Sequence, residues 1–226
     1  MDGDRTRVPG IPEGAFSTWR FRLPVAGGAI GRMEHKLVCA ALTAGRQLTP
    51  MSAVQITGMS GTGKTTIAVV LARQGLAAID ADDDHLLSRN IDSNGNVVED
   101  VAVPDFAWLA RHSWEWNPAR LDELIGAAAP APLHVCGCAD NELELADRFT
   151  QVFLLEIDEP TMLARLASRD KEFGRIGDTR EYQRRKLPEY QSRLRASGAI
   201  PIDARRPLDQ VVATILSHTS RSVETT

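Results

Sequence analysis

The 226-residue chain has no long hydrophobic run, few cysteines and little net charge. None of its apolar stretches approaches the roughly 20 residues that a helix needs to cross a bilayer, so we expect a soluble protein with no membrane partner. Its three cysteines, Cys39, Cys136 and Cys138, are an odd number without the spacing of a metal site, which favours reduced thiols in the cytoplasm. The net charge of −4 gives no reason to expect a nucleic-acid partner.

Hydrophobic periodicity is missing from the first fifty residues. They contain Pro9, Pro12 and Pro24 and seven Lys or Arg against four Asp or Glu, with no sustained helical or strand period. We therefore predict that residues 1–50 form a disordered or loosely attached arm, and that residues 221–226 form a disordered tail. The rest of the chain is long enough to bury a full core as one domain.

A phosphate-binding loop is the clearest feature that the chain does contain. Residues 58–65 read Gly-Met-Ser-Gly-Thr-Gly-Lys-Thr and fit the pattern G-x-x-x-x-G-K-[ST] without a mismatch. A predicted buried strand (53–57) precedes the loop, and apolar residues at helical spacing follow it. The backbone N–H groups of such a loop surround a polyphosphate, and the helix N-terminus adds partial positive charge. The predicted nucleotide-binding residues of this loop are Gly58, Ser60, Gly61, Thr62, Gly63, Lys64, Thr65 and Thr66.

Three side chains of the phosphate loop have separate expected roles. Lys64 is a point charge for the β and γ phosphates, Thr65 offers its hydroxyl to Mg²⁺, and Thr66 is placed to reach the α phosphate. The alternative is a glycine-rich turn that only joins a strand to a helix. Because the motif and its context agree, we expect ATP and Mg²⁺ as ligands.

An acidic segment follows the second predicted strand (76–79). It begins at Asp80 and runs through Asp84. Because the carboxyl ends of parallel strands share one edge of a sheet, we expect these carboxylates beside the nucleotide. Alternation gives Asp80 and Asp82 the same direction, and a phosphotransferase needs one carboxylate for the Mg²⁺ shell and one to accept a hydroxyl proton. The alternative is a solvated acidic turn.

Two irregular segments flank the expected site. Residues 85–117 contain Trp108, Trp114 and Trp116, and we predict that they form a flap over the phosphate acceptor. An apolar cluster under a long loop is the alternative for these tryptophans. Residues 170–178 contain two glycines and are predicted to form a mobile lid.

The sign of the charge changes along the chain. Residues 80–105 contain eight Asp or Glu and one Arg, whereas residues 161–206 contain twelve Lys or Arg and six Asp or Glu. Arg165 and Arg169 lie four apart, so they share one face of a predicted helix. Arginines on such a face either neutralise the transferred phosphate or lie in solvent, and we interpret this pair as catalytic.

Together these motifs resemble those of one enzyme group. The shared features are the phosphate loop, an Asp-x-Asp after the second strand, an Arg-x-x-x-Arg helix before a glycine-containing lid, and a last strand (199–203) followed by Arg-Arg-Pro and a helix. Over residues 53–218 this pattern resembles the small P-loop kinases of the shikimate kinase and nucleoside monophosphate kinase (adenylate kinase-like) group. The resemblance implies an α/β protein with a three-layer α/β/α P-loop NTPase fold and a five-stranded parallel sheet in the order 2-3-1-4-5. We therefore expect one P-loop kinase domain over residues 51–220.

The resemblance also implies roles for particular residues. Asp80 would serve the metal, Asp82 would serve the acceptor hydroxyl, and Arg205 and Pro207 would lie against adenine. The expected catalytic residues are thus Lys64, Asp82, Arg165 and Arg169, and the expected metal ligands are Thr65 and Asp80.

The sequence departs from the group in ways that bear on the acceptor. The glycine triplet with which shikimate kinases hold their acceptor is absent, and Gly137 stands alone. The third predicted strand (133–137) closes with Cys136-Gly137, where many related enzymes place Asp-Gly. No arginine comes just after the second strand to bind an acceptor carboxylate or phosphate. We predict an ATP-dependent kinase that transfers the γ-phosphate to a hydroxyl or phosphate of a small metabolite other than shikimate, with nucleosides and nucleotides among the candidates. The alternative is a P-loop ATPase or nucleotide-binding switch that acts through a partner protein.

Overall fold

The computed structural model describes residues 52–223, with side chains through residue 219. The arm expected over residues 1–50 lies outside the described residues, as do the last three residues of the chain. Helix α6 (Leu208–Val223) continues to Val223, so residues 221–223 of the predicted tail are helical. No helix within residues 52–223 is long and apolar enough to cross a membrane.

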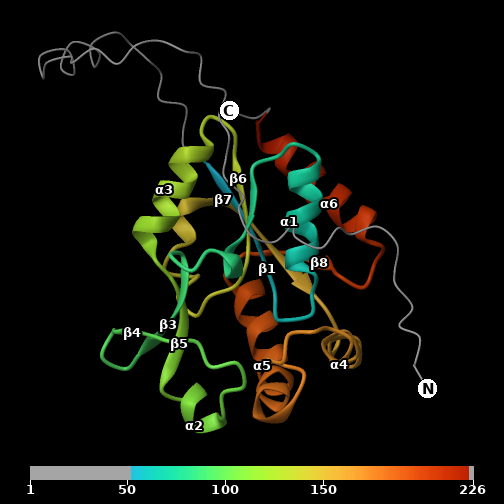
Figure 1. Cartoon of the computed structure of the whole chain (residues 1–226). Coiled ribbons are helices and arrows are strands. Elements are labelled where there is room, and N and C mark those ends of the chain that lie inside the picture. The colour runs from blue at the N-terminus through green and yellow to red at the C-terminus, as the bar shows by residue number, and fades with distance from the viewer. Residues whose placement is uncertain (1–51, 224–226) are drawn as a thin grey trace, which may run out of the picture. The chain divides into compact units, whose positions relative to one another are not determined.

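A parallel sheet forms the centre of the described chain (Figure 1). Its strands in spatial order are β2 (Ala78–Asp80), β6 (Leu133–Cys136), β1 (Ala53–Thr57), β7 (Phe149–Glu156) and β8 (Ile200–Asp203). All four pairings are parallel, and numbering only these five strands along the chain gives the order 2-3-1-4-5. The predicted fold class and strand order are therefore confirmed.

Helices cover both faces of this sheet (Figure 1). On one face, α1 (Lys64–Arg73) and α6 pack against Val54 and Ile56 of β1. The other face is covered by α3 (Pro118–Ala128), through Leu121 and Ile125, and by α5 (Gly177–Ala196), whose Leu194 meets Leu154 of β7. All five residues of β1 are buried, so the phosphate loop begins at the end of a fully buried central strand.

Helix starts follow local sequence signals. Asn117 caps α3 by accepting a hydrogen bond from the Ala119 N–H at 3.2 Å, and Pro118 occupies the first helical position. Asp158 caps α4 (Glu159–Ala167) in the same way, by accepting from the Thr161 N–H at 2.8 Å. The second cap fixes the start of the helix that carries Arg165.

The segment predicted to be an irregular flap contains a second sheet. Three antiparallel strands, in the order β4-β3-β5, form it with the short helix α2. Its elements are β3 (Ser88–Asp92), β4 (Val97–Val98), α2 (Phe106–Leu109) and β5 (His112–Trp116). The sequence did not predict these strands because β3 is mostly polar and lacks the alternation of apolar and polar residues on which strand prediction depends.

The lid segment joins α4 to α5. Residues 170–176 contain no helix or strand, and α5 begins at Gly177 and continues for 20 residues. Pro188 lies inside α5. The segment predicted as a lid is therefore a short connection between two helices, and its last two residues belong to α5.

Candidate active site

One cavity of about 1280 Å³ lies where β1, β2 and β6 end. Its walls come from the phosphate loop, the turn after β2, the flap, the lid, α5 and the start of α6. The predicted site residues that line it are Ser60, Gly61, Thr62, Gly63, Lys64, Thr65, Thr66, Asp82, Arg165 and Arg169. Gly58, Asp80, Arg205 and Pro207 do not line it.

Lys64 lies folded over the phosphate loop. Its Nζ donates hydrogen bonds to the carbonyl oxygens of Gly58 at 2.6 Å and Met59 at 3.3 Å, and the residue is only 7% exposed. Burial acts to lower the pKa of Lys64, but nearby acidic groups, Asp82 and Asp80 among them, raise it above its ordinary value. Lys64 is therefore a cation held at the centre of the loop.

The backbone of the loop leaves donors free for an anion. Gly63 is the N-cap of α1 with a φ of 103°, and no side chain caps the first turn of this helix. Gly58 permits close packing, because a Cβ there would lie 2.8 Å from the Leu155 carbonyl oxygen. Thr65 and Thr66, on the first turn of α1, are exposed. These features fit the binding of a polyphosphate at the helix N-terminus.

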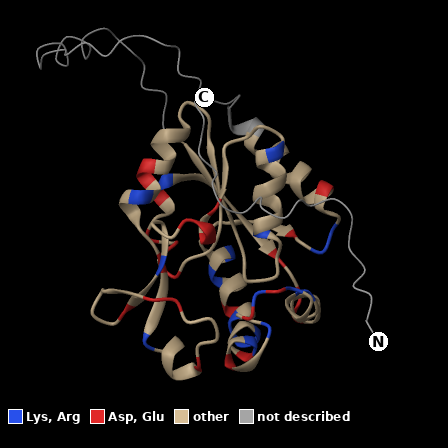
Figure 2. Cartoon of the chain, in the orientation of Figure 1, with Lys and Arg blue, Asp and Glu red and all other residues tan. Residues whose placement is uncertain are grey.

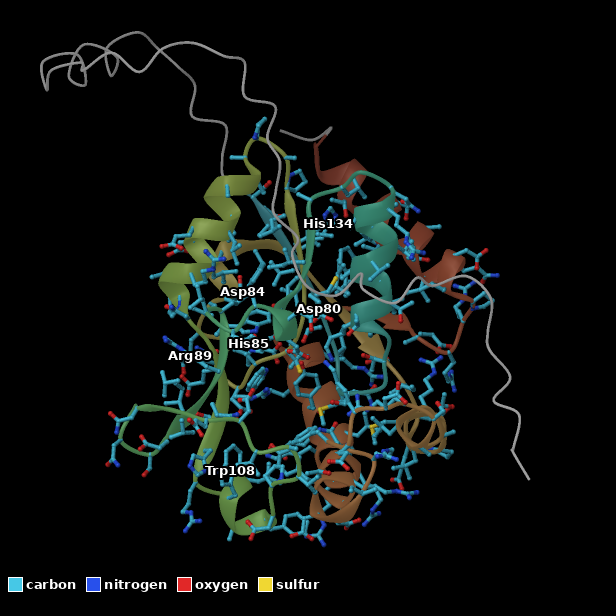
Figure 3. All side chains as sticks on the ribbon, viewed as in Figure 1. Asp80, Asp84, His85, Arg89, Trp108 and His134 are labelled. Carbon is cyan, nitrogen blue, oxygen red and sulfur yellow. The ribbon has the colours of Figure 1, made fainter. Side chains whose placement is uncertain are left out.

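The two predicted carboxylates lie together in the turn after β2. Asp80 accepts a hydrogen bond from the Asp82 N–H at 3.1 Å through Oδ1, and Figure 3 shows Asp80 beside α1. Among the described residues, Asp80 Oδ2 and Asp82 Oδ1 are buried and have no hydrogen-bond partner. Burial raises the pKa of Asp82 more than the neighbouring Lys64 lowers it, so the net shift is upward.

These oxygens fit a magnesium ion. Mg²⁺ takes oxygen ligands and commonly uses one or two carboxylates together with substrate phosphates. Asp80 and Asp82 each have an unpartnered oxygen, and Thr65 adds a hydroxyl from the phosphate loop. Since the described residues contain no group of three or more His, Cys, Asp or Glu that could hold a metal, the nucleotide phosphates would have to complete the ligand set.

Gly137 explains why this turn lies so close to the third strand of the central sheet. A Cβ at Gly137 would be 2.5 Å from the Ala81 Cβ and 2.9 Å from Trp116 Cζ2. Ala81 stands between the two carboxylate residues, in the short 3₁₀ helix η1 (Ala81–Asp83). A glycine after β6 is thus required for η1 to pack against the end of that strand.

The two predicted arginines line the cavity but make different contacts. Arg165 donates to the carbonyl oxygens of Gly61 at 3.3 Å and Ala204 at 2.9 Å, so it ties the phosphate loop to the segment after β8. Arg169 donates to the Phe173 carbonyl oxygen within the lid. Burial lowers the pKa of Arg169, whereas the nearby carboxylate of Asp82 acts to raise it. Figure 2 shows basic and acidic residues interspersed along α5 and the lid.

The segment after β8 differs from the predicted arrangement. Arg205 forms ion pairs with Asp158 at 3.0 Å and Asp203 at 2.8 Å, on the outside of the cavity. The residues of this segment that line the cavity include Arg206 and Leu208. From this segment, Arg206 lines the cavity, whereas Arg205 and Pro207, the residues predicted to lie against adenine, do not.

A buried polar network below the cavity was not found from the sequence. Glu142, whose side chain is fully buried, accepts hydrogen bonds from Gln55 Nε2 at 2.8 Å and Thr57 Oγ1 at 2.7 Å. Since Thr57 uses its only hydroxyl proton on Glu142, the Tyr190 hydroxyl, 2.6 Å away, must donate to Thr57. Arg193 Nη2 lies 3.6 Å from the other Glu142 oxygen. Two polar residues inside the central strand were the available signal, because a buried polar side chain needs a partner.

The flap contributes aromatic side chains to the far end of the cavity. Trp108 is stacked on His112 with ring centroids 4.1 Å apart, and both line the cavity with Trp114. Trp116 is instead a core residue, 1% exposed, with its ring 6.2 Å from that of Phe149. Trp108 and Trp114 therefore lie at the cavity, where the predicted contact with an acceptor requires them, whereas Trp116 belongs to the apolar core.

Comparisons with known proteins give one family and several structures. A family model described as an AAA domain matches residues 54–186, and no curated protein matches the chain.

Among solved structures, the chain is similar to a gluconokinase from Sinorhizobium meliloti 1021, with a TM-score of 0.45, 18% identity, and coverage of 80% of this chain and 97% of that chain. It is also similar to a deoxyadenosine kinase from M. mycoides with bound dATP, with a TM-score of 0.43, 14% identity and coverage of 74% and 99%. The family match spans the phosphate loop, the acidic turn, the flap and the lid.

Proposed function

The chain belongs to the AAA domain family, and from that premise we propose that it is a kinase that uses ATP to phosphorylate a hydroxyl or a phosphate of a small metabolite. The sheet order and the phosphate loop agree with the resemblance to small P-loop kinases. The observation that carries the proposal is that one cavity joins the phosphate loop and Asp82 to a further space walled by the flap and α5. A switch that only hydrolyses a nucleotide needs a place for water but no space of that kind.

ATP would lie along the first part of this cavity. Its phosphates would meet the N–H groups of the loop and Lys64, and its adenine would lie near Arg206, Leu208 and Val211, which line the same cavity at the start of α6. Thr65 and Asp80 would hold Mg²⁺, which supplies positive charge that offsets the phosphate oxygens when it is bound.

Asp82 is the proposed general base. Its free oxygen would accept the proton of the acceptor hydroxyl while the hydroxyl oxygen bonds to the γ-phosphorus and the bond from that phosphorus to the bridging oxygen breaks, which releases ADP. The raised pKa of Asp82 makes its carboxylate a stronger proton acceptor than an ordinary aspartate. Lys64 and Arg169 would stabilise the negative charge of the transferred phosphoryl group.

The test is ADP release measured across nucleosides, nucleotides, sugars and hydroxy acids. Acceptor-dependent turnover supports the kinase, whereas slow turnover that is the same with every acceptor supports a nucleotide switch that acts through a partner. The Lys64→Met variant is expected to lose turnover and to keep its melting temperature, because it removes a charge from the phosphates and retains an aliphatic side chain. Near-normal turnover in this variant would contradict the assigned role of the phosphate loop.

A further inference from the structure

The charges at the acceptor end of the cavity point to a class of acceptor. We call this end the acceptor chamber and define it by flap residues Asn90, Trp108, His112 and Trp114 and by Lys186 and Arg193 of α5, all of which line the cavity. The cavity's other basic side chains lie at the phosphate loop, in α4, in the lid or before α6, where ATP and the transferred phosphate need them. The charges at the chamber itself therefore determine which acceptors can bind there.

Neither arginine of the flap, Arg89 or Arg111, lines the cavity. Asn90 is paired with Trp114 across β3 and β5, and both line the cavity. Adjacent residues of a strand point to opposite faces, so the next pair, Arg89 and Glu115, lies on the outer face. Figure 3 shows Arg89 on the side of β3 that faces away from α5. The flap thus presents an amide and aromatic rings to the chamber rather than a cation.

The two cations of α5 that line the cavity, Lys186 and Arg193, already have carboxylate neighbours. Lys186 Nζ lies 3.4 Å from Glu189 Oε2, and Arg193 Nη2 lies 3.6 Å from the buried Glu142. The Arg193 guanidinium also lies over the ring of Tyr190, 5.6 Å from its centroid. Neither cation is left with an unbalanced charge for an anionic acceptor.

Two further carboxylates border the chamber through hydrogen bonds to its residues. Asp100 and Asp140 line the cavity, and within the described chain neither forms an ion pair. Asp100 accepts from Asn90 Nδ2 at 2.7 Å, and Asp140 accepts from the Trp114 N–H at 2.8 Å. Those neutral donors orient the carboxylates without removing their charge. Since Glu189 and Glu142 offset the charges of Lys186 and Arg193, Asp100 and Asp140 give the chamber a net negative charge.

We propose that the acceptor is an uncharged or cationic alcohol that carries a planar ring, and that this enzyme rejects acceptors bearing a phosphate or a carboxylate. The inference rests on the proposed kinase function and narrows it to hydroxyl acceptors. The negative chamber repels an anion, and no unpaired cation of the chamber compensates. The stacked rings of Trp108 and His112, with Trp114 beside them, supply flat surfaces for a ring.

The experiment compares acceptors in matched pairs that share a ring and a hydroxyl and differ in one anionic group. Uridine is compared with 5-carboxyuridine, and phenyl glucoside is compared with 4-carboxyphenyl glucoside, so that both members of a pair keep every hydroxyl. We expect kcat/KM to be at least about tenfold higher for the uncharged member wherever a pair is phosphorylated, since a like charge a few ångströms away opposes binding of the other member. Equal or better use of the anionic members overturns the inference and leaves the kinase function standing.

Two variants test whether the chamber itself causes the selection. Asn90→Arg places a cation beside Asp100, and it is expected to reduce the preference for the uncharged member at least about fivefold. Asn94→Arg makes the same chemical change at an exposed position of the flap that does not line the cavity, and it is expected to leave the preference unchanged. Equal effects of the two variants overturn the inference. ATP turnover that is the same with every acceptor overturns the inference together with the proposed function.

Discussion

Asp82 and Asp83 are adjacent, but their surroundings differ. Asp82 has a buried, unpartnered oxygen near Lys64, and burial raises its pKa, whereas Asp83 is exposed. A base in the first environment is both oriented and stronger. The two residues therefore provide a matched comparison of one substitution at neighbouring positions.

Asp82→Asn is expected to lower kcat by about 10²–10⁴ while ATP affinity is retained, because the phosphate loop stays intact. The wild-type rate should fall as the pH falls through the pKa of Asp82, which lies above the ordinary value of 3.8, because the carboxylate is then protonated. The variant should lack this acidic limb in its pH–rate profile. Asp83→Asn should keep kcat within about threefold, and a loss as large as that of Asp82→Asn would remove the assignment of the base.

Gly137→Ala is expected to lower both the melting temperature and kcat. The added Cβ would clash with Ala81 and push away the turn that carries the carboxylates, and overpacking of this kind typically costs about 1–3 kcal/mol. Ala81→Gly in the same chain removes the atom that is 2.5 Å away and should recover part of the stability. A double-mutant cycle in which the two substitutions are additive would show that this contact does not set the position of the turn.

At the scale of elements, Arg165 of α4 and Arg169, which lies between α4 and the lid, have different partners. Arg165 joins the phosphate loop to the segment after β8, while Arg169 lies near Asp82, the proposed general base. Arg165→Ala is therefore expected to raise the KM for ATP about tenfold, and Arg169→Ala is expected to lower kcat by ~10³. Steady-state kinetics of both variants separates the two effects.

Arg175→Ala provides the control for these variants. Arg175 belongs to the lid and contacts Glu172 at 3.9 Å, but it does not line the cavity. Its kcat and KM should stay within about threefold of the wild type. If Arg169→Ala behaves like Arg175→Ala, Arg169 takes no part in phosphoryl transfer.

Elements with local signals were predictable, and elements fixed by distant contacts were not. The phosphate loop, the cap at Asn117 and the five core strands depend on short motifs and buried apolar runs. Strand β3 is polar and is formed by pairing with β5, about 24 residues away in the chain, so its own sequence carries no strand period. Arg206 lines the cavity and Arg205 does not, because Arg205 forms two ion pairs outside it, one of them with Asp158, which is 47 residues away in the chain.

At the scale of the whole molecule, Glu142 makes stability depend on pH. Burial raises its pKa above 4.5, so the folded state binds this proton more tightly than the unfolded state. The contribution of this tighter proton binding to the free energy of unfolding is complete below pH 4.5. It is lost as the pH rises through the raised pKa of Glu142 in the folded state. Glu142 also could not be identified from the sequence, because its partners come from β1 and α5, more than 40 residues away on either side.

Glu142→Gln is expected to remove this contribution. The difference in unfolding free energy between wild type and variant, measured by chemical denaturation from pH 4.5 upward, should shift in favour of the variant as the pH rises. Glu144→Gln makes the same substitution at an exposed position two residues later and should leave the pH dependence unchanged. Parallel pH curves for all three proteins would mean that Glu142 does not titrate differently in the folded and unfolded states.

Pro188 divides α5 into two halves that are attached to different parts of the protein. Pro188 has no N–H, so the carbonyl of Arg184 receives no helical hydrogen bond from it. Beyond this point Tyr190 bonds to Thr57 and so fastens the second half to the central strand, whereas the first half continues directly from the lid. Lys186 lies on the half that follows the lid, and Arg193 lies on the half anchored to the sheet. A tilt of the first half about Pro188 would therefore change the width of the acceptor chamber while its floor stays fixed.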